Sequence, residues 1–489
     1  MTRLVPDPLL ERVAREPGAP ALRARSAEWS RGQLLEAADG LAAALLAEGV
    51  GEASRIACVL ADDAPAVALV HAARRLGAVH VPLNRRAAPA ELRYQLEVAR
   101  AEVVLADEAN AALAREAAGT TVPLQRIEAL LAGAPCAAPP ALRTRVDLDA
   151  LATIVFTSGT TGRPRGALLT HDNHRASAHA WAGLLRPAPG HRWLACLPLF
   201  HVAGLAIVTR VTRWGASLDL FDRFEVAAVS AALDDGLTHL SLVPAQLEDL
   251  LAFRDGRPAP GALQAILLGG GPIPTTLLQR ARAAGYRVLS TYGMSETASG
   301  VAAGGADAAT QADPAAGRAL PGVELRIEPD GTPDGSGEIL VRGAMVFAGY
   351  EGDAAATASA LRDGWLHTGD IGTLDEAGLL RVLDRRDDLI ISGGENVYPA
   401  EVEAVLAAHP AILEAAVYGV PDERWGAVPE AVVVVTSDAP ADEELLRHCR
   451  ERLAGYKVPR RLLRLDELPR NTFGKVRRGL LRQRAQEAI

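Results

Sequence analysis

Residues Ile154–Gly166 read IVFTSGTTGRPRG, a β-branched apolar run that passes directly into a loop rich in glycine and hydroxyl side chains. Glycines let backbone N–H groups approach an anion, and the hydroxyls add further donors. Arg163 and Arg165 supply positive charge that can pair with phosphate. The spacing differs from the GxxxxGK[ST] pattern of a Walker loop. The stretch therefore predicts a phosphate-binding loop on a buried strand, and a flexible surface loop is the less favoured interpretation.

The chain beyond this loop alternates between short apolar runs and helical patterns. Gln264–Leu268 and Arg287–Tyr292 are typical of buried strands, and Pro274–Ala284 between them is typical of a helix. Such a βαβ unit predicts a parallel sheet, in which ligands bind beyond the carboxyl ends of the strands. Gly269–Pro272 and Gly293–Thr297 follow directly after these two strands. We therefore expect part of a binding site there.

The N-terminal third shows the same alternation, with a helix expected at Ser30–Leu45 and strands at Arg55–Leu60 and His80–Pro82. The segment 134–140 is expected to be a loop. We therefore predict an α/β fold whose large N-terminal domain, residues 1–383, consists of α/β sheets and helices.

The pattern changes near residue 384, where a short charged segment, residues 384–388, separates two apolar runs. A helix is expected at Pro399–His409 and strands at Leu389–Ser392, Glu414–Val420 and Glu430–Val435. Residues 389–489 are therefore predicted to form a separate small α+β C-terminal domain.

Composition excludes several classes of protein. The 489 residues are 49% hydrophobic, which is typical of a globular chain. A net charge of −9 and only 4% aromatic residues argue against a nucleic-acid partner. The four cysteines lack the spacing of metal ligands, which argues against a structural zinc site. Asp7 and Glu11 interrupt the apolar run that a signal peptide needs. Pro198 breaks the longest apolar stretch, which argues against a membrane span. We expect a cytoplasmic protein without a membrane span.

Lysine is almost absent from the chain. Of the 51 basic residues, only Lys457 and Lys475 are lysines. Arginine serves equally well on a solvated face, so a retained lysine can mark a place that needs a compact ammonium, although chance retention is the alternative. Lys475 follows Gly474, which suits a loop that reaches into a cleft. The other basic residues between Lys457 and Arg484 are interpreted mainly as a solvated helix face, some of them facing phosphates.

Six motifs together resemble those of the adenylate-forming superfamily, which includes acyl-CoA and aryl-CoA synthetases, luciferases and peptide-synthetase adenylation domains. They are, in order, Thr157–Gly166, Tyr292–Thr297, Leu366–Asp370, Leu383–Asp388, Ser392–Asn396 and Pro469–Lys475. The resemblance implies that a carboxylic acid reacts with ATP and Mg²⁺ to give an acyl-adenylate and pyrophosphate. The acyl group then passes to the thiol of CoA, and AMP is released.

The resemblance also implies residue roles in the nucleotide site. Lys475 would bridge the substrate carboxylate and the α-phosphate, Glu296 would hold Mg²⁺, and Thr297 would hydrogen-bond the α-phosphate. Tyr292 would stack on adenine, and Asp370, assisted by Arg385, would bind the ribose hydroxyls. The other predicted ATP-binding residues are Thr157, Ser158, Gly159, Thr160, Thr161, Gly162, Arg165, Gly270, Gly271, Pro272 and Gly293. Arg165 stands where the family usually has lysine, and arginine keeps the charge.

In the small domain, the resemblance places Asp387 at a hinge, segment 384–388, about which this domain rotates between the two half-reactions. Gly393 and Gly394 would lie beside the tunnel for the pantetheine arm of CoA, where missing side chains leave room for the thiol. The resemblance thus implies a mobile small domain that first supplies Lys475 and then the glycine pair.

The segments 197–204, 238–247, 267–272 and 392–401 most resemble those of the 2-succinylbenzoate–CoA ligases of menaquinone biosynthesis. Their substrate is a dicarboxylate, so one carboxylate reacts and the other needs a cation, because an unpaired buried charge costs several kcal/mol. Arg210, which follows an apolar run, is the candidate cation, with a strand-end surface arginine as the alternative. The other predicted acyl-site residues are His201, Ser241, Gln246, Gly269 and Ser299; His201 is either a gate, with a catalytic role, or a satisfied core histidine.

Three alternatives remain open at this stage. A CoA ligase for a fatty or benzoic acid would share the motifs but have no use for a buried Arg210. A stand-alone adenylation module would load a carrier-protein thiol in place of CoA. A non-catalytic nucleotide sensor would bind ATP without releasing pyrophosphate. The sequence is also compatible with a homo-oligomer.

Overall fold

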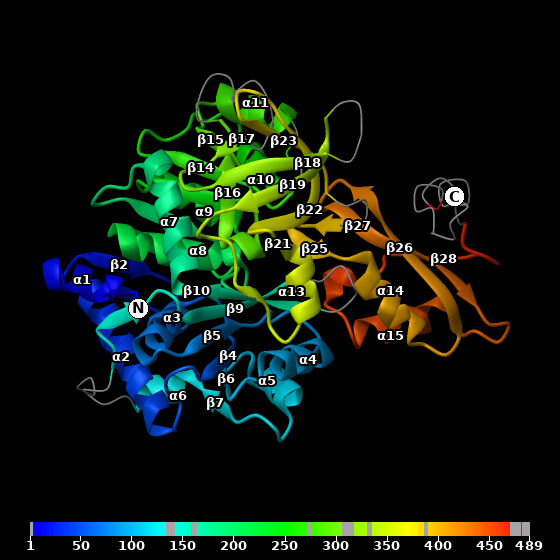
Figure 1. Cartoon of the computed structure of the whole chain (residues 1–489), viewed down its shortest axis with the longest axis horizontal. Helices are drawn as coiled ribbons and strands as arrows, with labels where there is room; N and C mark the ends of the chain where they lie inside the picture. The colour runs from blue at the N-terminus through cyan, green and yellow to red at the C-terminus, as the bar shows by residue number, and fades with distance from the viewer. Residues whose placement is uncertain are drawn as a thin grey trace.

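The computed structural model describes residues 3–133, 142–157, 164–271, 273, 275–305, 317–329, 335–385, 390–469 and 481. In Figure 1 the blue, green and yellow segments form one large body, and the orange segments form a smaller unit at its side. The predicted α/β fold, with a large N-terminal domain and a small α+β C-terminal domain, is confirmed. The segment 134–140, expected to be a loop, lies outside the described residues.

The first sheet of the large domain contains the strand that leads into the quoted loop. Its order is β20 (Gly349–Tyr350), β10 (Arg165–Thr170), β9 (Leu151–Thr157), β5 (Val79–Pro82), β4 (Arg55–Val59), β6 (Val103–Ala106) and β7 (Leu124–Arg126). β9 is buried over most of its length because β5 pairs with it on one side and β10 on the other. The predicted strands at residues 55–60 and 80–82 are thus confirmed.

A second, longer sheet carries the predicted βαβ unit. Its order is β18 (Glu324–Pro329), β19 (Gly337–Arg342), β22 (Trp365–Leu374), β23 (Leu379–Arg385), β17 (Gly317–Ala319), β16 (Ser299–Ala303), β15 (Val288–Met294), β14 (Ala265–Leu268), β13 (His239–Leu242), β11 (Arg192–Ala195), β12 (Ser217–Leu220), β2 (Pro20–Arg23) and β3 (Glu28–Ser30), and β21 (Leu361–Arg362) pairs with β22. β14 and β15 run parallel, and α11 (Thr275–Ala283) connects them, as predicted.

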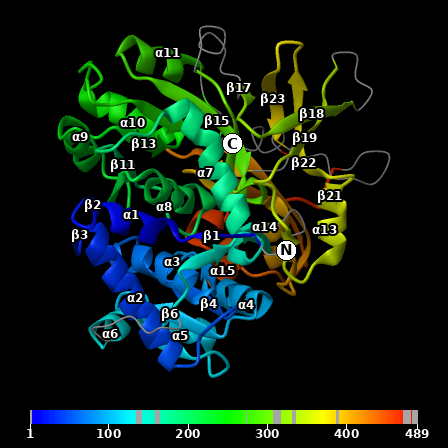
Figure 2. The ribbon, with the colours of Figure 1, turned by 60° about the vertical axis from the view of Figure 1, so that its left-hand side comes forward.

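Helices cover the sheets of the large domain. They are α1 (Pro8–Arg15), α2 (Arg31–Ala47), α3 (Ala64–Leu76), α4 (Pro89–Ala99), α5 (Ala111–Ala118), α6 (Ile127–Ala132), α7 (His171–Leu185), α8 (Val202–Trp214), α9 (Val226–Asp234), α10 (Pro244–Arg254) and α13 (Ala354–Ala360), together with α11. The helix α2 confirms the one expected at residues 30–45. Figure 2 shows α7 and α8 near the centre of the large domain, and α7 contacts both β10 of the first sheet and β16 of the second. In the described ranges, no helix combines the length and the hydropathy of a membrane span.

The small domain has its own sheet and core. The sheet order is β25 (Glu395–Val397), β24 (Ile390–Ser392), β27 (Gly426–Val435) and β26 (Ile412–Asp422), with β28 (Leu462–Arg464) on β27, and α14 (Pro399–Ala407) and α15 (Asp442–Arg450) pack against it. The chain passes from the large sheet to this one between Arg385 and Ile390. The predicted hinge residue Asp387 lies in that interval, outside the described residues, and the hinge stays a prediction.

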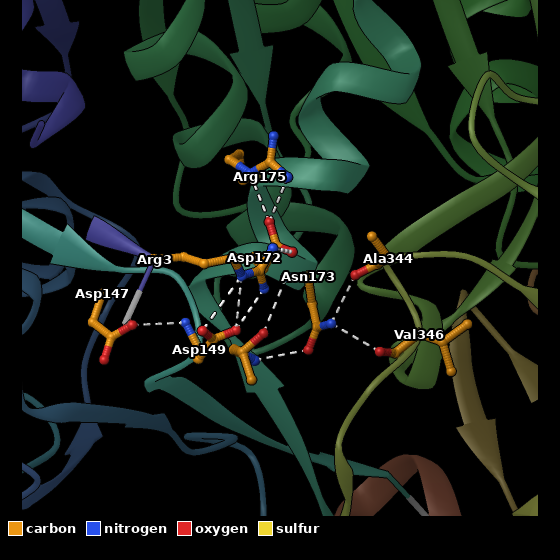
Figure 3. A network of polar contacts seen from close by, with 9 residues as sticks. Arg3, Asp147, Asp149, Asp172, Asn173, Arg175, Ala344 and Val346 are labelled. Atoms are coloured by element: carbon orange, nitrogen blue, oxygen red, sulfur yellow. Dashed lines mark hydrogen bonds and ion pairs between the residues drawn. The ribbon is translucent and has the colours of Figure 1, made fainter. Parts of the chain in front are cut away.

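Asn173, a buried residue at the start of α7, holds residues 344–346 in place through hydrogen bonds (Figure 3). Asn173 Oδ1 accepts a hydrogen bond from Thr170 N at 2.8 Å. Asn173 Nδ2 donates to the carbonyl oxygens of Ala344 and Val346 at 2.9 and 2.8 Å. The next residue, Phe347, donates its N–H to the carbonyl of Glu296 at 2.8 Å. The Asn173 side chain therefore connects α7 to residues 344–347. These residues in turn contact the backbone of Glu296, the predicted magnesium ligand.

We expect Asn173→Ala to lower the free energy of unfolding of the large domain by about 3 kcal/mol, because it leaves buried polar groups without partners. Arg175→Ala is the matched control on the same helix turn, since it removes only a partly exposed ion pair with Asp172 and should cost less than about 1 kcal/mol. Urea unfolding followed by tryptophan fluorescence compares the two. Equal losses would contradict this account of α7.

Candidate active site

A cavity of about 1180 Å³ lies between the two domains. The large domain supplies most of its wall, and the small domain supplies Gly393, Gly394 and Glu395 from the β24–β25 turn and Tyr456 and Lys457 from the 3₁₀ turn Gly455–Lys457. Ligand pockets are typically about 300–1,000 Å³, so this volume suits a large ligand or two adjoining ones. Polar and apolar side chains share the wall, which suits a substrate with both kinds of group.

The cavity brings together most of the predicted site residues that the structure describes. Those that line it are Thr157, Arg165, His201, Arg210, Ser241, Gln246, Gly269, Gly270, Gly293, Glu296, Ser299, Asp370, Gly393 and Gly394. Gly271, Tyr292 and Thr297 are not among the lining residues. Residues 158–162, Pro272 and Lys475 lie outside the described residues, so their roles stay predictions. Of Arg385 only the backbone is described, and it pairs with Asp370 across β22 and β23.

Glu296 provides a partly buried carboxylate at the edge of the cavity. The Tyr350 hydroxyl donates a hydrogen bond to Glu296 Oε1 at 2.7 Å, and burial raises the pKa of Glu296. Among the described residues, no basic side chain lies within ion-pair distance of this carboxylate. A carboxylate oxygen is the kind of ligand that Mg²⁺ prefers. The environment of Glu296 therefore fits the magnesium ion implied by the sequence.

Arg165 places positive charge next to Glu296. Its Nε lies 3.3 Å from Asp353 Oδ2, and its guanidinium lies 5.5 Å from the centre of the Tyr350 ring. Arg165 pairs with Thr157 in the register of β10 and β9, at the end of this strand pair that adjoins the predicted phosphate-binding loop. Arginine in place of the usual lysine thus still presents a cation to the cavity.

Tyr292 and Thr297 are buried behind the cavity wall in this structure. Tyr292 Oη donates to Asp370 Oδ2 at 2.7 Å. Thr297 Oγ1 lies 2.7 Å from the carbonyl oxygen of Ser299 and 3.0 Å from that of Met294. The geometry gives both hydroxyls a role in positioning neighbours, and their predicted contacts with adenine and the α-phosphate stay predictions.

Arg210 is a buried cation in the wall of the cavity. It lies on α8 and is only 2% exposed, so the interpretation as a strand-end surface arginine is wrong. Its guanidinium lies 5.2 and 5.6 Å from the ring centres of Trp181 and Trp193, and Nη2 donates to Ser299 Oγ at 3.1 Å. Burial lowers the pKa of Arg210 to about 9, which leaves it charged at neutral pH.

The charge of Arg210 has no carboxylate partner in the part of the chain that the structure describes, and its buried Nε has no hydrogen-bond acceptor there. Aromatic faces attract a cation but do not replace a counter-ion. An anionic group of a ligand would give Arg210 a counter-ion and would give its Nε a hydrogen-bond acceptor. A buried ion is stable only when it is paired and hydrogen-bonded.

His201 lines the cavity and contacts the small domain. Its side chain is 38% exposed, and Nε2 lies 2.8 Å from Glu395 Oε2. Arg86 of the large domain also pairs with Glu395. Burial alone would raise the pKa of Glu395, but the charges of His201 and Arg86 lower it to about 2. His201 is therefore not a satisfied core histidine, and its place at the cavity wall supports the prediction of a gate.

The two glycines of the small domain are required by close approaches of the backbone. Gly393 and Gly394 have φ values of +61° and +86°. A Cβ on Gly393 would lie 2.7 Å from the Trp425 ring, and one on Gly394 would lie 3.0 Å from Val243 of the large domain. Side chains at these positions would collide with their neighbours. The missing side chain of Gly394 therefore lets the small domain approach the large one, and that of Gly393 leaves room for Trp425 within the small domain.

Sequence reasoning missed the position of Lys457. This residue was grouped with the solvated basic residues, but its side chain is only 7% exposed and lies between Glu91 and Glu401. The near absence of lysine from the chain was the one signal that could have identified it.

Comparison with known proteins agrees with this geometry. Residues 9–351 match the model of the AMP-binding enzyme family, and residues 401–475 match the model of the AMP-binding enzyme C-terminal domain. The chain is 39% identical to a 2-succinylbenzoate–CoA ligase of Bacillus mycoides (strain KBAB4), over 99% of both chains.

Two solved structures of o-succinylbenzoate CoA synthetase from Bacillus subtilis are 37% identical to this chain and cover 98% of it. A double mutant bound with its product analogue superposes with a TM-score of 0.93, with 99% of that chain covered. The complex with the acyl-adenylate intermediate gives a TM-score of 0.76, with 98% of that chain covered. The arrangement described here is thus closer to that of the product-analogue complex. On the evidence of both domain models and of full-length relatives, the chain belongs to the AMP-binding enzyme family.

Proposed function

We propose that this chain is an ATP-dependent acid–thiol ligase that converts 2-succinylbenzoate and CoA to 2-succinylbenzoyl-CoA, AMP and pyrophosphate. The observation that carries the choice of acid is the buried, unpaired guanidinium of Arg210 in the cavity wall. A dicarboxylate can place one carboxylate on Arg210 and present the other for activation. The full-length similarity to 2-succinylbenzoate–CoA ligases supports the same acid.

In the first half-reaction, the succinyl carboxylate attacks the α-phosphate of ATP, and pyrophosphate leaves. Two negatively charged groups must approach each other, so positioned cations lower the barrier. Arg165, which lines the cavity, would hold the leaving phosphates, and Lys475 would bridge carboxylate and α-phosphate. Mg²⁺ held by Glu296 would neutralise phosphate charge. Asp370 offers carboxylate acceptors to the ribose hydroxyls.

In the second half-reaction, the CoA thiol attacks the carbonyl carbon of the acyl-adenylate, the thioester bond forms, and AMP leaves. The thiol must reach the carbonyl through the boundary between the domains. Gly393 and Gly394 lie on that boundary and line the cavity, and His201 lies near its acyl end. The closed arrangement described here suits this step.

We expect Arg210→Leu to lower kcat/KM for 2-succinylbenzoate by at least about 100-fold, the scale of breaking one buried ion pair. 3-Benzoylpropionate is the same acid without the ring carboxylate, so its kcat/KM should change by less than about threefold. Pyrophosphate release measures both substrates. Leucine removes the cation and leaves an apolar side chain, so no buried charge remains unpaired in the variant.

The control for this experiment is Arg213→Leu, one turn later on α8, because Arg213 does not line the cavity. The proposal of a carboxylate-binding Arg210 fails if Arg210→Leu slows the two acids equally. Retention of full activity with 2-succinylbenzoate would favour a ligase for a monocarboxylic acid, such as a fatty or benzoic acid.

Lys475→Ala should slow acyl-adenylate formation by at least about 10²-fold, the scale of one lost electrostatic contact. It should spare thioester formation from supplied acyl-adenylate, because that step does not need the bridging cation. Single-turnover assays separate the two rates. Equal slowing of both would contradict the role assigned to Lys475.

A further inference from the structure

Lys457 joins the two domains through buried ion pairs. Its Nζ donates to Glu401 Oε1 at 2.6 Å, and Glu401 lies on α14 of the same small domain. The same Nζ donates to Glu91 Oε1 at 2.7 Å, and Glu91 lies on α4 of the large domain, 366 residues earlier. Tyr456 accepts a hydrogen bond from Asn84 Nδ2 of the large domain at 3.2 Å. This turn of the small domain is therefore fixed to the large one by side chains.

The three charged side chains are shielded from water. Those of Lys457, Glu91 and Glu401 are 7%, 7% and 4% exposed. Glu91 is itself held in place, since Oε2 accepts the N–H of Ala88 at the start of α4. If the domains part, Lys457 keeps its pair with Glu401, but Glu91 loses its partner and the attraction between Glu91 and Lys457 is lost. The contact therefore favours this arrangement of the domains.

The two carboxylates differ in what a movement of the small domain would do to them. Glu401 moves with Lys457 and keeps its ion pair in any orientation. Glu91 belongs to the large domain, so its pair with Lys457 exists only when the domains meet as they do here. A compact ammonium with three donors can bridge two carboxylates, which suits lysine better than the planar guanidinium used elsewhere in this chain.

We infer that Lys457 is a positioning residue that locks the small domain onto Glu91 in the arrangement used for thioester formation. The lock must open for the chain to form acyl-adenylate in the other arrangement. The inference rests on the proposed two-step ligase reaction. It agrees with the closer match of this structure to the product-analogue complex of the relative from Bacillus subtilis than to its acyl-adenylate complex.

The decisive variant is Glu91→Gln, which weakens the bond across the domains and leaves the pair between Lys457 and Glu401 intact. We expect thioester formation from supplied 2-succinylbenzoyl-adenylate and CoA to slow about tenfold, the effect of one charge-assisted hydrogen bond. Pyrophosphate release in a single turnover without CoA should stay within about twofold of the wild type, because the lock is not used there. Glu97→Gln, an exposed glutamate on the same helix, is the matched control and should change neither rate.

Lys457→Met completes a double-mutant cycle with Glu91→Gln. The slowing of thioester formation should be no greater in the double variant than in Lys457→Met alone. Additive effects of the two substitutions, or equal slowing of both half-reactions by Glu91→Gln, would overturn the inference.

A second measurement does not depend on the identity of the acid. Hydrogen exchange of residues 390–398 and 454–459 should be faster in Glu91→Gln than in the wild type and unchanged in Glu97→Gln. If the wild type forms no adenylate with any acid, the proposed function fails, and this measurement still tests the lock. Unchanged exchange in Glu91→Gln would overturn it.

Discussion

The structure depends on how charges are compensated in a cavity between two domains. Ions that are buried away from water need an opposite charge nearby. Glu395 and Lys457 of the small domain find theirs on the large domain, in Arg86, His201 and Glu91. These pairs mark where the domains meet. Among the described residues, Arg210 has no carboxylate partner and Glu296 has no basic group within ion-pair distance, and we propose that both face ligand charges.

The fold places these groups by simple means. Strand β9 and its partner β10 present Arg165 at the cavity, and β15 ends in the turn that carries Glu296. The helix α8 begins directly after His201 and buries Arg210 two turns later against Trp181 and Trp193. The β24–β25 turn then brings Gly393 and Gly394 against the large domain. Each half of the proposed reaction thus uses a different face of the same cavity.

Much of the fold was predictable because it follows from local patterns. The strand at residues 151–157, the βαβ unit around α11 and the separate C-terminal domain all have short-range signals of hydrophobic period and turn residues. The charged segment 384–388 is the signal from which the boundary of the small domain is predicted. The predicted site rested on the six sequence motifs. Most of its residues that the structure describes line one cavity.

The rest depended on contacts between residues far apart in the chain. Arg210 was expected to be buried, but an apolar run such as 204–208 does not distinguish a strand from a helix, and the alternative of a surface position followed from that ambiguity. Lys457 was assigned to solvent because its partner Glu91 lies 366 residues away and no local pattern connects them. The burial of Tyr292 and Thr297 behind the cavity wall likewise follows from how β15 packs and not from its motif.

The most direct test of the central claim is pyrophosphate release by the wild-type chain with ATP, Mg²⁺ and CoA, compared across 2-succinylbenzoate, benzoate, octanoate and malonate. A cavity built around an unpaired buried cation should prefer 2-succinylbenzoate in kcat/KM by at least about 100-fold, since a site made for a polar group discriminates strongly against acids that lack it. Benzoate and octanoate leave Arg210 without a carboxylate partner, and malonate is a much shorter dicarboxylate without the aromatic ring. A preference for benzoate or octanoate would contradict the account of Arg210 and of the acid.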